Sequence, residues 1–326
     1  MPGAGGGDRP RFVVDESSFD FRGLGEERLT DLLDDFCDVL EELGGRWTVM
    51  VSPWWTETEC ADGQPLFEVL YENGVPRPGR DARLRMVRLM DRCPAWSPDL
   101  SGLPDRVEVA GIVRDMAWSI GYAWRQARDG HHTCCLVFPG PGPRGWQPVT
   151  ATTGPPPAPA TAAVHFLAAL SAHGEFWRSL FTREDVTEQD FLHRVREAFP
   201  GLAFADSLTF RKFDGTYREL RDWVVHALSV IHDHFADALH GHAGIPHQVQ
   251  AALGRHGIDV SPESPKTRAS RKLMKQREVT HEGEVYECEW HAKKDRHRNR
   301  VHFSLPDPRL EGRLLIGIFT DHLPTE

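Results

Sequence analysis

Lysine is scarce in this chain of 326 residues, and the few that occur are unevenly placed: five of the six lie between Lys266 and Lys294. The sequence also lacks any run of eighteen apolar residues, which argues against a membrane-spanning helix. None of its six cysteines forms a C-x-x-C pair, so a zinc ribbon is not indicated. We therefore expect a cytoplasmic protein with reduced thiols and no membrane partner.

Familiar enzyme motifs are missing as well. The GAGGG of the N-terminal segment is not followed by Lys and then Ser or Thr, so it is not a P-loop. Neither a G-x-S-x-G nucleophile elbow nor a dinucleotide-binding fingerprint occurs, and we expect no cofactor. The first ten residues, MPGAGGGDRP, lack the apolar core of a secretory signal, and we expect them to form a disordered tail.

The chain does carry a basic segment on an acidic body. Between Lys266 and Arg300 there are eleven Lys and Arg against six Asp and Glu, which gives a net charge of +5. Because the whole chain carries −10, the remainder carries −15. A basic, histidine-rich segment on an acidic protein indicates a place where an anionic partner docks.

The first half of the sequence predicts an α/β domain over residues 11–150. Apolar side chains recur at helical spacing over residues 26–43, and further helices are expected over 81–93 and 107–128. The short apolar runs RWTVMVSPWW and TCCLVF are typical of buried strands. The Pro- and Gly-rich residues 151–160 that follow are expected to form a linker or a surface loop.

Residues 161–260 are expected to be mostly helical, beginning with a helix over 161–173. This region contains a histidine-rich stretch, residues 226–247. Helices rich in histidine can bind zinc, but this one lacks the i, i+4 histidine pair of the H-E-x-x-H motif. We therefore favour solvated or capping histidines there and expect no metal.

From Val279 onward the period of the apolar residues changes to two, which predicts β-strands. Three strands with short connections, around YECEWHAKK, RVHFSL and RLLIGIFTDHL, should form an antiparallel meander. We expect residues 261–326 to be a basic, β-rich module with a basic helix. The predicted fold is thus α/β plus α+β: an N-terminal α/β layer, a helical middle and a C-terminal meander.

The first two strands of the meander carry the predicted catalytic residues. If they pair as a hairpin, alternate polar side chains share one face, about 6.6–7 Å apart along each strand, which suits groups that flank a phosphodiester. His or Glu can move protons near neutral pH, and Lys or Arg can stabilise the charge on phosphorus. The predicted set is Glu289, His291, Lys293, Arg300 and His302. The competing interpretation is a solvated sheet face with weak cross-strand ion pairs.

The order of a helix, YECEWHAKKDRHRNRVHF and LLIGIFTDHL resembles the C-terminal part of RelE/ParE-fold toxins over about the last sixty residues. Arg300 matches the arginine on the second strand of that family. The resemblance implies a bacterial toxin module that cleaves ribosome-bound messenger RNA with basic, histidine or acidic side chains and without a metal. The turn is longer here, and about 260 residues precede the similar region.

These features predict a bacterial nucleic-acid-targeting effector, of the toxin or antiviral-defence type, that acts on RNA in preference to DNA. Further basic residues are expected to contact the nucleic-acid backbone. They are Lys266, Arg271, Lys272, Lys275, Lys294, Arg296 and Arg298.

Two alternatives remain open. The first is a non-enzymatic subunit that binds nucleic acid or protein in a larger assembly, or in a homo-oligomer. The second is a metal-dependent nuclease of the restriction-endonuclease type, which needs Glu-x-Lys on one strand. Glu289 and Lys293 are instead four residues apart, about 13 Å along a strand, and one metal-bound water could not easily serve both.

Overall fold

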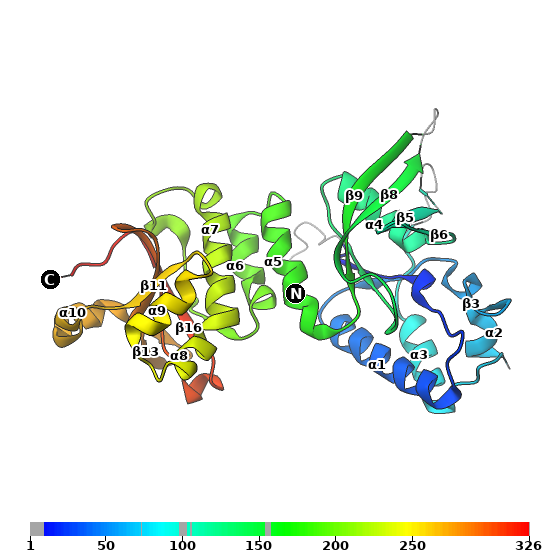
Figure 1. Ribbon diagram of the computed structural model, residues 1–326, viewed down its shortest axis with the longest axis horizontal. Coiled ribbons are helices and arrows are strands. Elements are labelled where there is room, and N and C mark those ends of the chain that lie inside the picture. Colours follow the sequence, from blue (N-terminus) through cyan, green and yellow to red (C-terminus); the bar gives the residue numbers. More distant parts are fainter. Residues whose placement is uncertain (1–9, 73, 98–102, 105, 154–157, 326) are drawn as a thin grey trace, which may run out of the picture. The chain divides into compact units, whose positions relative to one another are not determined.

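The computed structural model describes residues 10–72, 74–97, 103–104, 106–153 and 158–325. The chain divides into two compact units, Met1–Phe176 and Trp177–Glu326, and the division falls within helix α5 (His173–Arg183). The predicted fold class is confirmed, with an α/β sheet first, helices next and antiparallel strands last (Figure 1). Across the described ranges, no helix combines the length and the apolar character that crossing a bilayer requires.

The first unit is built on a sheet whose described strands run in the order β2-β1-β7-β9-β8-β5-β6. Strands β2, β1, β7 and β9 are parallel, and the remaining pairs are antiparallel. A separate pair joins β3 (Glu59–Ala61) and β4 (Gln64–Pro65). The bounds in the main sheet are β1 (Phe12–Val14), β2 (Val49–Met50), β5 (Val107–Val109), β6 (Ile112–Arg114), β7 (Cys134–Leu136), β8 (Gly145–Thr153) and β9 (Ala158–Leu167).

Helices cover this sheet because each carries an apolar stripe. Helix α4 packs on β7 and β9, and its Ile120 and Trp124 are buried in one core with Val149 and Phe166. Helix α1 packs against α3, where Arg85 forms ion pairs with acidic residues of α1. The helices are α1 (Glu26–Gly44), α2 (Leu66–Tyr71), α3 (Arg80–Met90) and α4 (Trp118–Arg128), with 3-10 turns η1 (Glu16–Ser18), η2 (Trp55–Glu57) and η3 (Leu170–Ala172).

Two predicted helices of this region are partly or wholly strands. Residues 107–114 form the hairpin β5–β6, which turns at Ala110 and Gly111, both with positive φ. The predicted helix over 161–173 is mostly β9, which pairs with β7 on one side and β8 on the other. Pairing on both edges satisfies the backbone of β9 and overrides the helix propensity of its alanines.

Residues 151–160, expected to form a linker or a surface loop, lie partly in strands. Residues 151–153 end β8 and residues 158–160 begin β9, while 154–157 lie outside the described residues. The paired strands form a long hairpin (Figure 1). The Pro- and Gly-rich composition therefore accompanies a hairpin within the first unit.

Helices precede the antiparallel strands of the second unit. Helix α7 begins with a capping box of Thr216 and Glu219, buries Leu220, Val224 and Leu228, and continues into a π-helical turn. The bounds are α6 (Glu188–Ala198), α7 (Tyr217–Val230), the π-helix η5 (Ile231–Phe235), α8 (Ala236–Gly241) and α9 (Pro246–Gly254), with the 3-10 turn η4 (Phe210–Lys212) after α6.

The sheet of the second unit has the order β10-β16-β15-β14-β11 among its described strands. The predicted meander is confirmed as β14-β15-β16, β11 adds an antiparallel edge, and β10 lies parallel to β16. On one face, Trp290 and Phe303 pack edge-on against Phe235. The bounds are β10 (Leu202–Phe204), β11 (Asp259–Pro262), β14 (Trp290–Asp295), β15 (Arg298–Phe303) and β16 (Leu314–Thr320), with η7 (Pro308–Leu310) before β16.

A basic insertion separates β11 from β14. It contains two short helices, a 3-10 turn and a hairpin that does not join the main sheet. Tyr286, which the sequence placed on the first strand of the meander, belongs to this hairpin instead. The elements are α10 (Pro265–Ala269), α11 (Arg271–Met274), η6 (Lys275–Arg277), β12 (Glu278–His281) and β13 (Glu284–Glu287).

Candidate functional site

The register of β14 and β15 brings four of the five predicted catalytic residues onto one face. His291 lies opposite His302, and Lys293 lies opposite Arg300. Residues directly opposite each other in an antiparallel pair point to the same side, so these four share a surface of the sheet. Glu289 precedes β14 and is half-buried, and burial raises the pKa of its carboxyl group.

This polar face is largely covered. His302 has no exposed surface, His291 is 5% exposed and Arg300 is 7% exposed. Arg277, from the insertion, is completely buried and donates to the backbone oxygens of Leu273 and Pro324. The insertion and the C-terminal segment therefore contact each other above this face of the sheet. The alternating sequence pattern had predicted that the same face is exposed to solvent.

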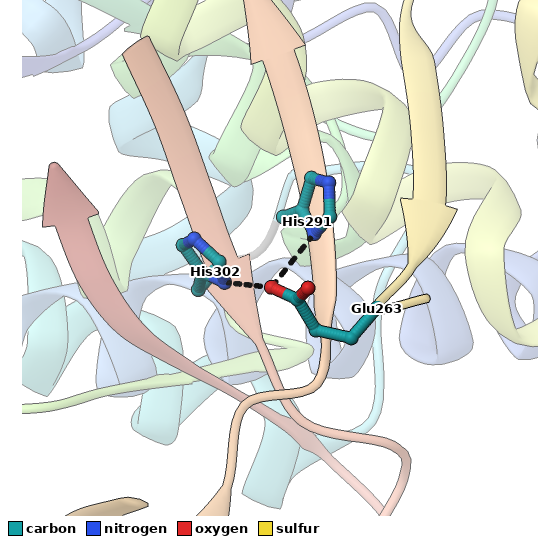
Figure 2. A group of neighbouring side chains, drawn as sticks. All are labelled: Glu263, His291 and His302. Atoms are coloured by element: carbon teal, nitrogen blue, oxygen red, sulfur yellow. Dashed lines mark ion pairs between the residues drawn. The ribbon is translucent and has the colours of Figure 1, made fainter. Parts of the chain in front are cut away.

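A buried carboxylate that the sequence analysis did not single out faces both histidines. Glu263 follows β11 and is 3% exposed. Its Oε1 lies 3.6 Å from His291 Nδ1 and 3.9 Å from His302 Nδ1, and Figure 2 shows both rings directed at this carboxylate. The same oxygen accepts a 2.7 Å hydrogen bond from Arg277 Nε. The signal available in the sequence was the position of Glu263 at the end of a short strand, which was not recognised as a strand.

Burial sets the protonation of the two histidines. Loss of hydration, followed by the charges of Arg277 and Arg300, lowers the pKa of His302 to about 3. Burial, reinforced by His302 and Arg300, lowers the pKa of His291 even further below its usual range. Both imidazoles are therefore neutral at pH 7, which is the form that accepts a proton or binds a metal ion.

Arg300 is the buried cation of this face. Burial lowers the pKa of its guanidinium, yet arginine stays protonated at neutral pH. Its Nη2 donates to the backbone oxygen of Arg296 at 3.3 Å, and its buried Nε has no hydrogen-bond partner. Within the part of the chain that the structure describes, no carboxylate forms an ion pair with Arg300, although Glu263 and Asp321 act on it at longer range.

A histidine that the sequence analysis also missed lies near Arg300. His322 follows β16 and is exposed. Burial lowers its pKa, as does the positive charge of Arg300. His322 lies within the predicted strand RLLIGIFTDHL, but the candidate residues were taken from the first two strands of the meander alone.

The predicted nucleic-acid contacts are all exposed. Those in the insertion lie on α10, α11 and η6, and the others lie on β14, β15 and the turn between them. Arg298 forms an ion pair with Asp214 at 2.8 Å, and Lys293 forms one with Asp259 at 3.4 Å. The remaining six predicted contacts form no ion pair with another described residue. They are Lys266, Arg271, Lys272, Lys275, Lys294 and Arg296.

The histidine-rich stretch 226–247 makes structural contacts. His232 accepts a hydrogen bond from the Gly201 N–H and lies beside Arg178 and Asp233. The ring of His234 stacks on that of His256 at 3.8 Å. Over the described residues, only Glu263, His291 and His302 form a group of three whose ligand atoms all lie within 4.8 Å of one another.

Comparisons with known proteins identify no relative of this chain. No protein-family model matches it, and neither a curated protein nor a solved structure is similar enough to count as a match. The resemblance to RelE/ParE-fold toxins therefore stays a prediction, and function has to be inferred from the residues themselves.

Proposed function

We propose that this chain is a nucleic-acid-targeting effector of the toxin or antiviral-defence type, and that its C-terminal module binds and cleaves RNA. The observation that carries the proposal is the environment of Arg300. This cation is only 7% exposed, and no carboxylate among the described residues forms an ion pair with it. A buried guanidinium without a counter-ion is costly, and an entering phosphate would supply the missing charge through paired hydrogen bonds.

The surroundings of Arg300 fit a phosphodiester. Lys293 lies opposite it on β14 and is held only by a 3.4 Å pair with the exposed Asp259. Six basic side chains on the insertion, β14 and the β14–β15 turn form no ion pair with another described residue, and they would attract the rest of the nucleic-acid backbone. The acidic remainder of the chain favours contact through this end alone.

Cleavage would follow the usual course for RNA. The 2′-hydroxyl oxygen attacks phosphorus and loses its proton to a base, while the departing 5′-oxygen takes up a proton from an acid. This gives a 2′,3′-cyclic phosphate and a 5′-hydroxyl end. Arg300 and Lys293 would stabilise the added negative charge on phosphorus. His322, exposed and near Arg300, is the titratable side chain best placed to exchange protons with both substrate and solvent.

A second candidate is binding without turnover. The observation that favours it is the burial of His291, His302 and Arg300, because binding on the exposed basic side chains needs no access to this covered face. Salt-dependent RNA binding by the intact chain, with no product formed, would support this candidate.

The test uses a labelled single-stranded RNA and the DNA of the same sequence. Cleavage is assayed both in EDTA and with added divalent metal, and binding is measured on an RNA with a 2′-deoxy block. We expect Arg300→Ala to reduce cleavage about 10²-fold, as for removal of a group that stabilises transition-state charge. Arg300→Lys, which keeps the charge but not the paired donors, should retain part of the activity.

Arg218→Ala is the matched control, because Arg218 is an exposed arginine of α7 paired only with Asp185. Melting temperatures of all variants separate loss of the site from loss of the fold. Full cleavage and binding by a folded Arg300→Ala protein would refute the assignment.

A further inference from the structure

Three buried side chains in the second unit point toward one another, and together they have the composition of a metal site. The donors come from three neighbouring pieces of the sheet: Glu263 after β11, His291 on β14 and His302 on β15 (Figure 2). We propose that they bind one divalent transition-metal ion of the zinc or ferrous type. The inference is independent of RNA cleavage, because metal binding can be measured without any nucleic acid.

The spacing of the donor atoms fits such an ion. A metal with ligands at about 2.0–2.2 Å in tetrahedral geometry holds those ligands about 3.3–3.6 Å apart. Glu263 Oε1 lies 3.6 Å from His291 Nδ1 and 3.9 Å from His302 Nδ1. All the ligand atoms lie within 4.8 Å of one another, so side-chain movements of about 1 Å for the widest pair would bring the carboxylate and both imidazoles onto one ion.

The unpaired state of the donors is the second observation. The Nδ1 atoms of His291 and His302 are both buried, and neither makes a hydrogen bond with the described residues. Buried polar atoms are normally satisfied, so two such atoms aimed at one carboxylate oxygen call for a ligand between them.

Arg277 supplies the outer contact that metal-binding carboxylates usually have. Its Nε donates to Glu263 Oε1 at 2.7 Å, and two further hydrogen bonds fix its guanidinium. Contacts of this kind orient a ligand before the metal arrives. The donor set of two imidazoles and one carboxylate is that of catalytic zinc and non-haem ferrous sites, which keep positions open for other ligands.

The nearby positive charges select what fills those open positions. Arg277 and Arg300 both act electrostatically on His302, and Lys293 acts on His291. A divalent ion would add to this positive charge, so the stable complex should include an anionic ligand such as hydroxide or phosphate. We therefore expect inorganic phosphate to tighten metal binding.

The first measurement is on the wild-type chain. Metal-free protein is titrated with Zn²⁺ and with Co²⁺, with and without inorganic phosphate, and metal content is determined after gel filtration. We expect one ion per chain, a rise in melting temperature, and Co²⁺ absorption bands in the visible. Absence of stoichiometric Zn²⁺ and Co²⁺ binding by folded wild-type protein would overturn the proposal.

Variants then locate the ion. Glu263→Gln, His291→Gln and His302→Gln should each weaken Zn²⁺ binding at least tenfold, whereas His240→Gln, in the exposed histidine-rich stretch, should not change it. X-ray absorption of the wild-type complex should show only nitrogen and oxygen neighbours, including imidazole. This readout needs no variant to fold, and sulfur neighbours or unchanged binding in all three site variants would contradict the assignment.

Discussion

The two units of this protein bury carboxylates in opposite ways. In the first, Asp15 and Glu16 follow β1, are both completely buried, and form no ion pair with the residues that the structure describes. In the second, Glu263 is equally buried but its Oε1 accepts a hydrogen bond from the buried Arg277. A buried acid can thus be accommodated by holding its proton or by gaining a cation, and each solution leaves its own experimental mark.

Near neutral pH, the unpaired Glu16 of the first unit holds its proton. Burial and the neighbouring charge of Asp15 raise the pKa of Glu16 to about 8, although the Ser119 N–H donates to its Oε1 at 2.8 Å. Burial also raises the pKa of Asp15, against hydrogen bonds from Ser17. Near neutral pH the first unit therefore keeps a proton that its unfolded chain would release.

Breaking the buried pair of Arg277 and Glu263 should have the largest effect on the free energy of unfolding. Arg277→Leu leaves Glu263 buried without its cation, and loss of one member of a buried pair costs about 3–5 kcal/mol. We expect urea unfolding to show this loss, with hydrogen exchange accelerated in β14 and β15. Arg218→Leu, which removes an exposed pair with Asp185, should cost less than about 1 kcal/mol. Equal costs for the two variants would show that burial of the pair is not decisive.

The unpaired arrangement predicts a dependence on pH instead. The pKa of Glu16 is about 8 in the folded chain and 4.5 without the shift, so the unfolded chain binds fewer protons between these values. Stability of the first unit should therefore fall as pH rises from 4.5 to 8, by up to about 1.4 kcal/mol per pH unit. Glu16→Gln should flatten the profile and stabilise the protein at pH 8. The measurement is hydrogen exchange in β1 and β7 across this range.

The matched control is Glu57→Gln, because Glu57 is exposed on η2. It should leave the profile of the first unit unchanged. A steep fall in stability that persists in Glu16→Gln would assign the effect to another group, with Asp15 the nearest candidate.

In the metal-free protein, the buried histidines of the second unit predict that stability changes with pH in the opposite direction. The pKa of His302 falls from 6.5 to about 3 on folding, so protonation favours the unfolded chain. Stability is complete above pH 6.5 and is lost as pH falls toward 3, about 1.4 kcal/mol per histidine at pH 5.5. Relative to the intrinsic exchange rate at each pH, amides in β14 and β15 should therefore lose protection on acidification while those in β1 gain it. Parallel changes in both units would contradict the contrast between them.

Much of the fold could be predicted from periodicity, and the exceptions have a common cause. The helix over 26–43 and the meander at the end of the chain have clear periods, and both are present as α1 and β14-β15-β16. The expected helix over 161–173 is rich in alanine, but β9 gains hydrogen bonds from β7 and β8. The secondary structure of such segments depends on strands that are distant in the sequence, and a local sequence pattern contains no information about those strands.

The candidate site shows the same limit more sharply. Alternation along two strands was enough to place His291, Lys293, Arg300 and His302 on one face. It could not supply Glu263, which directly follows β11, because the 27 residues 263–289 separate β11 from β14. Nor could it show that Arg277 and the C-terminal segment cover the face, because burial arises only when the insertion folds back.

The smallest expected effect concerns the exposed basic residues. Lys272 on α11 and Lys275 on η6 form no ion pair with other described residues, so their removal should cost less than about 0.5 kcal/mol of stability. Each phosphate contact on a single strand contributes about 0.7 to the slope of log affinity against log salt. Lys272→Ala/Lys275→Ala should therefore lower that slope by about 1.4 for RNA binding by the full chain.

The control for this pair lies outside the basic segment. Arg211→Ala/Arg218→Ala removes the same charge from η4 and α7. If both double variants lower the slope equally, net charge alone explains RNA binding and the insertion has no special part in it. If only the lysine variant does so, the RNA contacts lie on the basic insertion.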